Sequence, residues 1–266
     1  MLERLDKILV DQGYAASRTQ AQKLIEAGVV EAKIQGQWLS LNKPAQKIPA
    51  DTILRTGEID ELRFVSRAGL KLERALQHLN STGIFSSDAL RGAVILDIGQ
   101  STGGFTDCLL NFDVQKVVGI DVGHDQLAQK LRDHPSVVCL EGINGRQMPN
   151  EILLSYATQG FSGAVMDVSF ISQTLILPQI PPLLSPNGFL LSLVKPQFEV
   201  GAKNLGKNGV VKNSDLYDDV RSTVVSCAEM TGLRQVAYFE SAIEGGDGNR
   251  EFFMLCQKPA SPLYAE

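Results

Sequence analysis

The first 60 residues combine two helical patterns of apolar residues with several short strand-like runs. Leucines at helical spacing, followed by Gly13, predict a first helix over residues 2–12. Ser17, with Gln20 three residues later, is a typical capping pair and predicts a second helix that ends at Gly28. Apolar residues with Gly and Pro between them then predict short strands at residues 29–34, 38–41 and 52–55. A unit of this size can just support its own core.

A different pattern begins after one further helix, expected over residues 66–80. From Arg91 onward, β-rich runs alternate with helical ones, which is typical of a parallel, doubly wound sheet. Helical stretches separate the first five of the expected strands, which are residues 93–99, 116–122, 137–142, 163–169, 188–195, 235–241 and 250–256. The last two are joined by the turn-rich loop 242–249 and are expected to form an antiparallel hairpin. A mostly parallel seven-stranded α/β sheet with such a hairpin is the Rossmann-like arrangement of methyltransferases, whereas dinucleotide-binding domains are all parallel.

Composition and charge narrow the class of protein. The 266 residues are 44% hydrophobic and 21% charged, as in ordinary globular proteins. No apolar run reaches the roughly 18 residues of a membrane span, and the first residues lack a secretory pattern, so a cytoplasmic location is expected. The cysteines and histidines lack metal-ligand spacing, so neither a metal nor a disulfide is expected. A net charge of −5 argues against a general nucleic-acid binder, but a local basic patch is compatible with RNA binding.

The first strand after Arg91 runs into a glycine-rich loop, Asp97-Ile-Gly-Gln-Ser-Thr-Gly-Gly-Phe105. Glycines at such a turn let the backbone approach a ligand, and the following helix points its N-terminus at the same place. Asp121 ends the second strand, at the distance from Asp97 where an acid binds ribose hydroxyls. Asn144, after the third strand, is placed to face an adenine edge. The candidate cofactor residues are Asp97, Gly99, Ser101, Thr102, Gly103, Gly104, Phe105, Asp121, Asn144 and, after the fourth strand, Asp167.

Three cofactors suit a loop of this kind, namely NAD, FAD and S-adenosylmethionine. The spacing G-x-x-x-G-G differs from the G-x-G-x-x-G of dinucleotide sites. An acid before the loop is also unfavourable beside a pyrophosphate, whereas the sulfonium and amino-acid tail of S-adenosylmethionine favour one. S-adenosylmethionine is therefore the expected cofactor, and a purely structural βα turn is the alternative.

Two charged residues end neighbouring strands of the expected sheet. Asp167 lies in DVSF after the fourth strand, and Lys195 lies in VKPQFE after the fifth. Open α/β sheets place their sites at these carboxyl ends, although each residue alone is also compatible with a solvated strand end. No cysteine nucleophile accompanies DVSF, which disfavours cytosine C5 methylation. A lysine and a carboxylate suit an alcohol acceptor, because the hydroxyl loses its proton as it attacks the methyl group.

Seven segments along the chain carry a family resemblance: RLDKILVDQGYAASRTQAQKLIEAG, FVSRAGLKLERAL, DIGQSTGGFTDCLL, VVGIDVG, DVSFIS, LVKPQFEVG and GGDGNREFFM. In this order they resemble the hemolysin A (TlyA-type) family of rRNA 2′-O-methyltransferases, relatives of FtsJ/RrmJ that carry an S4 RNA-binding domain. The resemblance implies methylation of ribosomal RNA, in naked or subunit form, with cytidine as the expected acceptor. It also implies a small α+β S4-type domain over residues 1–60, a linker over 61–66 and a methyltransferase domain over 67–266.

The family's Lys-Asp-Lys-Glu catalytic set falls on Lys71, Asp167, Lys195 and Glu251. The resemblance implies that Lys195 activates the ribose 2′-hydroxyl, while Asp167 and Lys71 set its charge state and position. Glu251 would complete the network. Without the family, Lys71 reads as a solvated helix residue and Glu251 as a hairpin charge. Gln100 departs from the family, in which this loop position is usually small.

RNA contacts are expected from basic residues of the small unit and of the junction that follows it. Acidic and basic residues balance in the unit, so a patch rather than the whole surface must bind RNA. The lysine-rich loop 201–212 is either an RNA contact or a plain surface loop. The candidate RNA-binding residues are Arg4, Lys7, Arg18, Lys23, Arg63 and Arg67.

Two other functions compete with the enzyme. A non-catalytic RNA- or ribosome-binding factor with a relict methyltransferase fold would not bind S-adenosylmethionine. A membrane-lysing hemolysin, as the family name suggests, would need a span, a signal or a basic amphipathic helix, and the sequence has none that stands out. The oligomeric state, the modified nucleotide and the ribosomal subunit have no signature in the sequence.

Overall fold

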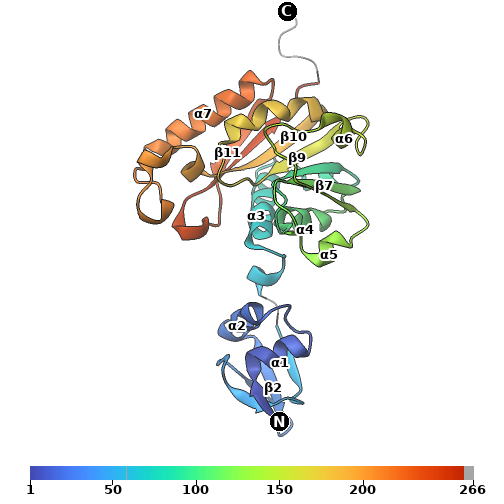
Figure 1. Cartoon of the computed structure of the whole chain (residues 1–266), viewed down its shortest axis with the longest axis vertical. Coiled ribbons are helices and arrows are strands. Elements are labelled where there is room, and N and C mark those ends of the chain that lie inside the picture. The colour runs from blue at the N-terminus through green and yellow to red at the C-terminus, as the bar shows by residue number, and fades with distance from the viewer. Residues whose placement is uncertain (58, 261–266) are drawn as a thin grey trace, which may run out of the picture. The chain divides into compact units, whose positions relative to one another are not determined.

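The computed structural model describes residues 1–57 and 59–260, and the chain divides into two compact units, one ending at Arg63 and one beginning at Phe64 (Figure 1). Leu62 packs against the apolar core of the first unit. Phe64 is buried in an apolar core of the second. The boundary therefore falls inside residues 61–66.

Two helices and two small sheets make up the first unit. Its elements are β1 (Leu2–Arg4), α1 (Leu5–Asp11), α2 (Arg18–Glu26), β2 (Val30–Ile34), β3 (Gln37–Ser40), β4 (Lys47–Pro49) and β5 (Leu54–Thr56). β3, β2 and β5 form an antiparallel sheet in that order, and β1 pairs with β4. Leucine and isoleucine side chains of both helices fill the core against β2 and β5. The small unit is therefore α+β, as expected.

The sequence pattern predicts the start of α2 correctly and the start of α1 incorrectly. Ser17 Oγ accepts the N–H of Gln20 at 3.2 Å, which confirms the cap of α2. The prediction of a helix from Leu2 is wrong, because residues 2–4 form β1 and α1 begins at Leu5. Leu5 and Leu9 are buried, whereas Leu2 is 62% exposed, so only two of the three leucines belong to the core face.

A seven-stranded sheet forms the centre of the second unit. Its main elements are α3 (Arg67–Ser81), β6 (Val94–Ile98), α4 (Gly104–Leu110), β7 (Lys116–Asp121), α5 (Gln129–Arg132), β8 (Val137–Glu141), α6 (Asn150–Leu154), β9 (Phe161–Met166), β10 (Leu184–Val194), α7 (Leu216–Met230), β11 (Arg234–Glu240) and β12 (Phe252–Gln257). The strand order is β11-β12-β10-β9-β6-β7-β8, and β12 is antiparallel to both of its neighbours. The expected mostly parallel sheet with a C-terminal antiparallel hairpin is confirmed.

Helices cover both faces of this sheet (Figure 1), because successive strand residues point to opposite sides. Phe252 and Met254 of β12 join the core under α6 and α7. Phe253 and Leu255, between and after them, join the core under α3 and α4. The continuous apolar runs of the strands thus fill two cores, as in doubly wound sheets.

The connection between β9 and β10 departs from expectation. A helical stretch is predicted there, but the chain forms three short 3₁₀ turns, at Gln173–Leu175, Leu177–Gln179 and Pro181–Leu183. Pro178, Pro181 and Pro182 explain the difference, because proline removes a backbone donor and interrupts a longer α-helix. The compact turns still bury Ile176, Ile180 and Leu183 under the sheet.

The direction of winding changes at β6, which has β7 on one side and β9 on the other. The chain moves from β6 through β7 to β8, then returns to β9 and continues through β10. In an open α/β sheet such a switch point leaves a crevice at the carboxyl ends of the strands. The loops after β6, β7 and β9 meet at this point.

Candidate active site

A cavity of about 630 Å³ opens at the carboxyl ends of β6, β7 and β9. Gly99, directly after β6, has φ +85°, and a Cβ there would lie 2.5 Å from the carbonyl oxygen of Asp167. Glycine at this position therefore lets the ends of β6 and β9 approach closely. The expected cofactor residues that line the cavity are Gly99, Ser101, Asp121, Asn144 and Asp167.

The acid after β7 is held by the loops around it. The two carboxylate oxygens of Asp121 accept the backbone N–H groups of Ser101 at 2.8 Å and Gly123 at 2.7 Å. These bonds tie the glycine-rich loop to the end of β7. The side-chain oxygen of Asn144 accepts the N–H of Arg146 at 3.0 Å and shapes the turn after β8. Both expected ligand-binding side chains are thus fixed in the wall of the cavity.

Asp97 does not line the cavity but lies fully buried near the end of β6. Thr106 Oγ1 donates to Asp97 Oδ2 at 2.6 Å, and Gln100 Nε2 donates to Thr106 Oγ1 at 2.9 Å. Asp97 Oδ1 has no hydrogen-bond partner among the described residues. Burial raises the pKa of Asp97 to about 7, and the charges of Asp167 and Asp121 act in the same direction. Thr106 therefore stabilises the charged form at Oδ2, whereas Oδ1 lacks a donor in the described part of the chain that would do the same.

Gln100, the residue that departs from the family pattern, extends this buried network. A Cβ on Gly119 of β7 would overlap the Gln100 amide, so glycine at 119 leaves the space that the side chain occupies. The side chain is 3% exposed, and its Oε1 has no partner among the described residues. Gln100 thus supports Thr106 from the protein side and is not part of the cavity wall.

Four of the expected cofactor residues pack the start of α4 and do not line the cavity, namely Thr102, Gly103, Gly104 and Phe105. The carbonyl of Thr102 accepts the N–H of Ala128 at 3.2 Å. A Cβ on Gly103 would overlap Leu131, and one on Gly104 would overlap Ser66. Phe105 is buried and stacks on Phe253, with ring centroids 6.4 Å apart. These four residues lie away from the cavity because α4 enters the core directly after the glycine-rich loop.

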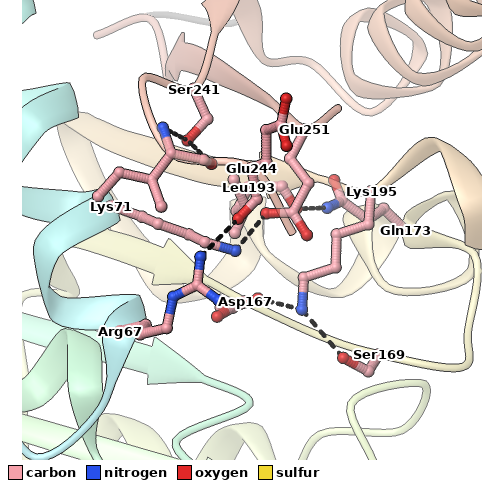
Figure 2. Close-up of polar contacts among 11 residues, drawn as sticks. Arg67, Lys71, Asp167, Ser169, Gln173, Leu193, Lys195, Ser241, Glu244 and Glu251 are labelled. Carbon is pink, nitrogen blue, oxygen red and sulfur yellow. Dashed lines mark hydrogen bonds and ion pairs between the residues drawn. The ribbon is translucent and has the colours of Figure 1, made fainter. Parts of the chain in front are cut away.

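A carboxylate and an ammonium meet at the ends of β9 and β10 (Figure 2). Met166 of β9 pairs with Ser192 of β10, so Asp167 and Lys195 follow neighbouring strand ends. Lys195 Nζ lies 2.6 Å from Asp167 Oδ1 and donates to Ser169 Oγ at 2.9 Å. The two side chains of the ion pair are 13% and 16% exposed, so the pair is shielded but open to a substrate. Because Asp167 also lines the cavity, the pair stands at its edge.

A second ion pair lies next to the first. Lys71 on α3 and Glu251, directly before β12, are both buried, and Nζ lies 2.6 Å from Oε2. β12 pairs with β10 up to Phe252 and Val194, so Glu251 and Lys195 occupy adjacent ends of the two strands. Burying two charges costs desolvation free energy that their attraction offsets only in part, so stability alone explains this pair poorly. The four members of the Lys-Asp-Lys-Glu set thus come from α3 and the ends of β9, β10 and β12 (Figure 2).

One aromatic residue of the site escaped sequence reasoning. Phe170 lines the cavity, is 91% exposed and has φ +64°, which is unusual for a bulky residue. Its ring lies 5.1 Å from that of Phe198, measured between centroids. A large apolar side chain three residues after the strand-end acid, at the last position of DVSF, was the available signal. The exposed ring offers a flat apolar surface beside the Asp167–Lys195 pair.

Three expected RNA-binding residues in the first unit are bound to acids of their own unit. Asp6 is fully buried and accepts hydrogen bonds from the Arg4 and Arg18 guanidinium groups, each at about 3.0 Å. The Arg4 guanidinium holds the pKa of Asp6 well below its usual range. Lys7 Nζ donates to Glu3 at 2.7 Å. The three basic side chains remain about half exposed, so internal pairing and an external contact are both open to them.

The other three expected RNA-binding residues have different surroundings. Arg67 donates to the carbonyl of Glu244 at 3.3 Å and so ties α3 to the loop before β12 (Figure 2). Arg63 lies 3.6 Å from the Asp60 carboxylate. Lys23 is half-buried on α2. RNA binding by these residues stays a prediction.

Metal-binding clusters, membrane-spanning helices and disulfides are absent from residues 1–57 and 59–260. No group of three or more His, Cys, Asp or Glu side chains in that part of the chain is placed to hold a metal ion. None of its helices is long and apolar enough to span a bilayer. Cys108, Cys139, Cys227 and Cys256 form no disulfide with one another.

Comparison with known proteins adds to the geometry. The FtsJ-like methyltransferase family matches residues 64–258, and the S4 domain matches residues 3–31. A Mycobacterium tuberculosis protein named 16S/23S rRNA (cytidine-2′-O)-methyltransferase TlyA is 38% identical, over 94% of this chain and 88% of its own. This chain belongs to the TlyA-type family of FtsJ-like methyltransferases.

Two further relatives align with almost all of this TlyA-type chain. A Bacillus subtilis protein named as a candidate rRNA methyltransferase, YqxC, is 40% identical over 97% of this chain and 86% of its own. The solved structure of a candidate hemolysin from Streptococcus thermophilus has a TM-score of 0.70 at 38% identity, and the match covers 98% of this chain and 90% of that one. The expected family and the S4 domain before a methyltransferase fold are confirmed.

Proposed function

We propose that this TlyA-type protein transfers a methyl group from S-adenosylmethionine to the ribose 2′-hydroxyl of a cytidine in ribosomal RNA. The observation that carries the proposal is the convergence of two ion pairs, Asp167–Lys195 and Lys71–Glu251, at the edge of the cavity. The acceptor is supported by the M. tuberculosis relative, which is named as a 16S/23S rRNA (cytidine-2′-O)-methyltransferase. The partner would be naked rRNA or a ribosomal subunit in the cytoplasm.

The residues around the cavity fit S-adenosylmethionine. The cofactor is cationic, and its charge would provide the stabilisation that the buried Asp97 carboxyl lacks. Asp121 and Asn144 would hold its ribose and adenine, and Gly99 lets the ends of β6 and β9 approach each other beside the cavity. When bound, the cofactor supplies an electrophilic methyl group on a sulfonium centre.

Lys195 would act on the proton of the acceptor hydroxyl. As the new carbon–oxygen bond would form and the carbon–sulfur bond would break, the hydroxyl proton would pass to the Lys195–Asp167 pair, which can take up one proton because its carboxylate is ionised. Ser169 and Asp167 fix Lys195 Nζ from two sides, at 2.9 and 2.6 Å, so its position is set before substrate binds. No metal ion is part of this proposal.

The buried pair would complete the electrostatics of the site. Lys71 and Glu251 add one positive and one negative charge beside the Asp167–Lys195 pair, so the four side chains together carry no net charge. A neutral but strongly polar site can orient a hydroxyl without binding counterions. Phe170, next to the pair, would stack on the base of the acceptor nucleotide, as exposed aromatic rings do in RNA-binding proteins.

Residues 1–60 would guide the enzyme to a folded RNA, and residues 67–266 would perform the transfer. The S4 domain supports RNA binding by the first part. In the second part, loop 201–212 carries Lys203, Lys207 and Lys212, all exposed, and it follows the strand that ends at Lys195. Both regions would contact phosphates around the target nucleotide.

A labelling experiment tests the proposed function. Purified protein and radiolabelled S-adenosylmethionine are incubated with ribosomes, separate subunits and naked rRNA, and the modified position is mapped by its resistance to alkaline hydrolysis. We expect labelling of at least one substrate, and a loss of about a hundredfold or more for Lys195→Ala. Lys116→Ala, at the amino end of β7, is the matched control and should retain activity. Absence of labelling by wild type, together with no calorimetric binding of the cofactor, would instead support a non-catalytic RNA-binding factor.

A further inference from the structure

The loop that carries Asp167, Ser169 and Phe170 is fastened to β10 by two side chains outside the Lys-Asp-Lys-Glu set. We call residues 167–172 the acceptor loop. Gln173 directly follows this loop, and Glu199 follows the 3₁₀ turn Pro196–Phe198, just beyond Lys195. Neither residue lines the cavity.

Gln173 is 2% exposed, and its side chain hydrogen-bonds to β10 beyond the point where β9 stops pairing with that strand. β9 pairs with β10 only as far as Ser192. Gln173 Nε2 donates to the next carbonyl, that of Leu193, at 2.5 Å, and Gln173 Oε1 accepts from Ser192 Oγ at 2.7 Å. Ser192 is fully buried, so both ends of the amide are satisfied inside the protein by the strand that leads to Lys195.

Glu199 holds the end of the same loop. Its carboxylate accepts Ser172 Oγ at 2.6 Å and the backbone N–H of Gln173 at 2.8 Å. Burial raises the pKa of Glu199, so placing a carboxyl group here has a cost that its hydrogen bonds offset. The two oxygens face two donors of the segment that ends the acceptor loop.

We propose that Gln173 and Glu199 are positioning residues that clamp the acceptor loop onto β10, so that Asp167 and Ser169 meet Lys195 in the geometry needed for transfer. This inference rests on the proposed methyltransferase function. Gln173 follows Ser169 by four residues, and Glu199 follows Lys195 by four residues. Glu199 accepts the backbone N–H of Gln173, and Lys195 binds Asp167 and Ser169. A shift of about 1 Å at a reacting centre can lower a rate about a hundredfold.

Four variants separate positioning from simple stability. Glu199→Ala and Gln173→Ala each remove one half of the clamp. Glu199→Gln keeps it in neutral form, because an amide oxygen accepts the Gln173 N–H and its NH₂ group donates to Ser172 Oγ. Val224→Ala, a core truncation on α7, lowers stability without removing any of these hydrogen bonds and is the control.

The measurements are kcat and KM for rRNA, the thermal unfolding midpoint, and hydrogen exchange of a peptide spanning residues 167–176. We expect Glu199→Ala and Gln173→Ala to lower kcat about ten- to a hundredfold while KM for rRNA changes less than about threefold. Exchange of the peptide should accelerate in both variants without substrate. Glu199→Gln should restore kcat to within about threefold of wild type and restore slow exchange. Val224→Ala should lower the unfolding midpoint and leave kcat, measured at low temperature, within about twofold.

Two results would overturn the inference. One is a kcat for Glu199→Ala equal to that of wild type. The other is a kcat loss in Val224→Ala as large as that in Glu199→Ala, since the effect would then follow stability. If wild type labels no RNA, the proposed function fails, and the exchange data still decide whether the clamp holds the loop.

Discussion

The folded chain without a ligand disfavours the ionised form of the Asp97 carboxyl. Burial raises its pKa to about 7, and one carboxylate oxygen has no partner among the described residues. We expect S-adenosylmethionine to bind the ionised form, so its affinity should fall as pH drops below about 7. Between pH 8 and pH 6 the dissociation constant, measured by calorimetry, should rise about tenfold. Binding at pH 7 should also release about half a proton, seen by comparing buffers of different ionisation enthalpy. An affinity that stays flat over this range would contradict the role of Asp97.

For Asp97, we expect the stability of the folded chain and the affinity for the cofactor to have opposite requirements. Its folded pKa, about 7, exceeds the ordinary value of 3.8, so folding favours the protonated carboxyl. The stabilisation of that form is complete below about pH 4 and is lost as pH rises through 7. Asp97→Asn should therefore raise the free energy of unfolding of the unliganded protein by about 1–4 kcal/mol at pH 8, with little effect near pH 4. Urea unfolding at both pH values measures this, and calorimetry should show lost cofactor binding. A variant less stable than wild type at pH 8 refutes the prediction.

Sequence reasoning found those site residues whose position in the chain reveals them. Asp167 and Lys195 stand directly after apolar strands, and such ends gather at one edge of a parallel sheet. Lys71 and Glu251 came only from the family resemblance, because a buried ion pair between distant segments has no local pattern. Proximity to the glycine-rich loop predicted Phe105, which is a core residue. The same reasoning missed Phe170, whose exposed ring follows β9.

At the scale of elements, the Lys71–Glu251 pair joins α3 to the start of β12. Removing one partner leaves the other buried and uncompensated. Lys71→Met alone should therefore lower the free energy of unfolding by about 3–5 kcal/mol. Lys71→Met combined with Glu251→Leu should recover most of this loss, because two apolar groups can pack where the ions were. The double variant should still lose about a hundredfold or more in methyl transfer. Urea titration and the labelling assay measure the two effects. An active double variant would show that the pair serves stability only.

Elements with strong periodicity were predictable, and short ones were not. The seven strands of the second unit appear within a few residues of their expected positions, because long apolar runs at regular intervals specify a buried parallel sheet. β1 and β4 have three residues each, and the pairing between them depends on segments far apart in the chain. The 3₁₀ turns between β9 and β10 follow from prolines, which interrupt the helix that the alternation of strands and helices alone predicts.

At the scale of the whole molecule, a net charge of −5 means that RNA affinity must come from patches. In the first unit, much of the basic charge is already bound: Asp6 holds Arg4 and Arg18. Loop 201–212 is different, because Lys203 and Lys207 are exposed and have no acid partner among the residues that the structure describes. Asn249 anchors this loop: it accepts the N–H of Val211 and donates to the carbonyl of Gly209, each at 3.2 Å. The loop is therefore held beside the turn that carries Glu251.

An anchored loop with free lysines next to the site should bind phosphates, and the salt dependence of RNA binding can count those contacts. Replacing Lys203 and Lys207 together by Gln should weaken rRNA binding and reduce the slope of log K against log salt by about 1.4, the value for two phosphate contacts to single-stranded RNA. Arg91→Gln with Lys116→Gln removes the same charge at the opposite, amino end of the sheet and should leave the slope unchanged. Equal slopes for wild type and the loop variant would assign RNA binding elsewhere. Equal losses in both double variants would mean that net charge alone, and not the position of the loop, governs affinity.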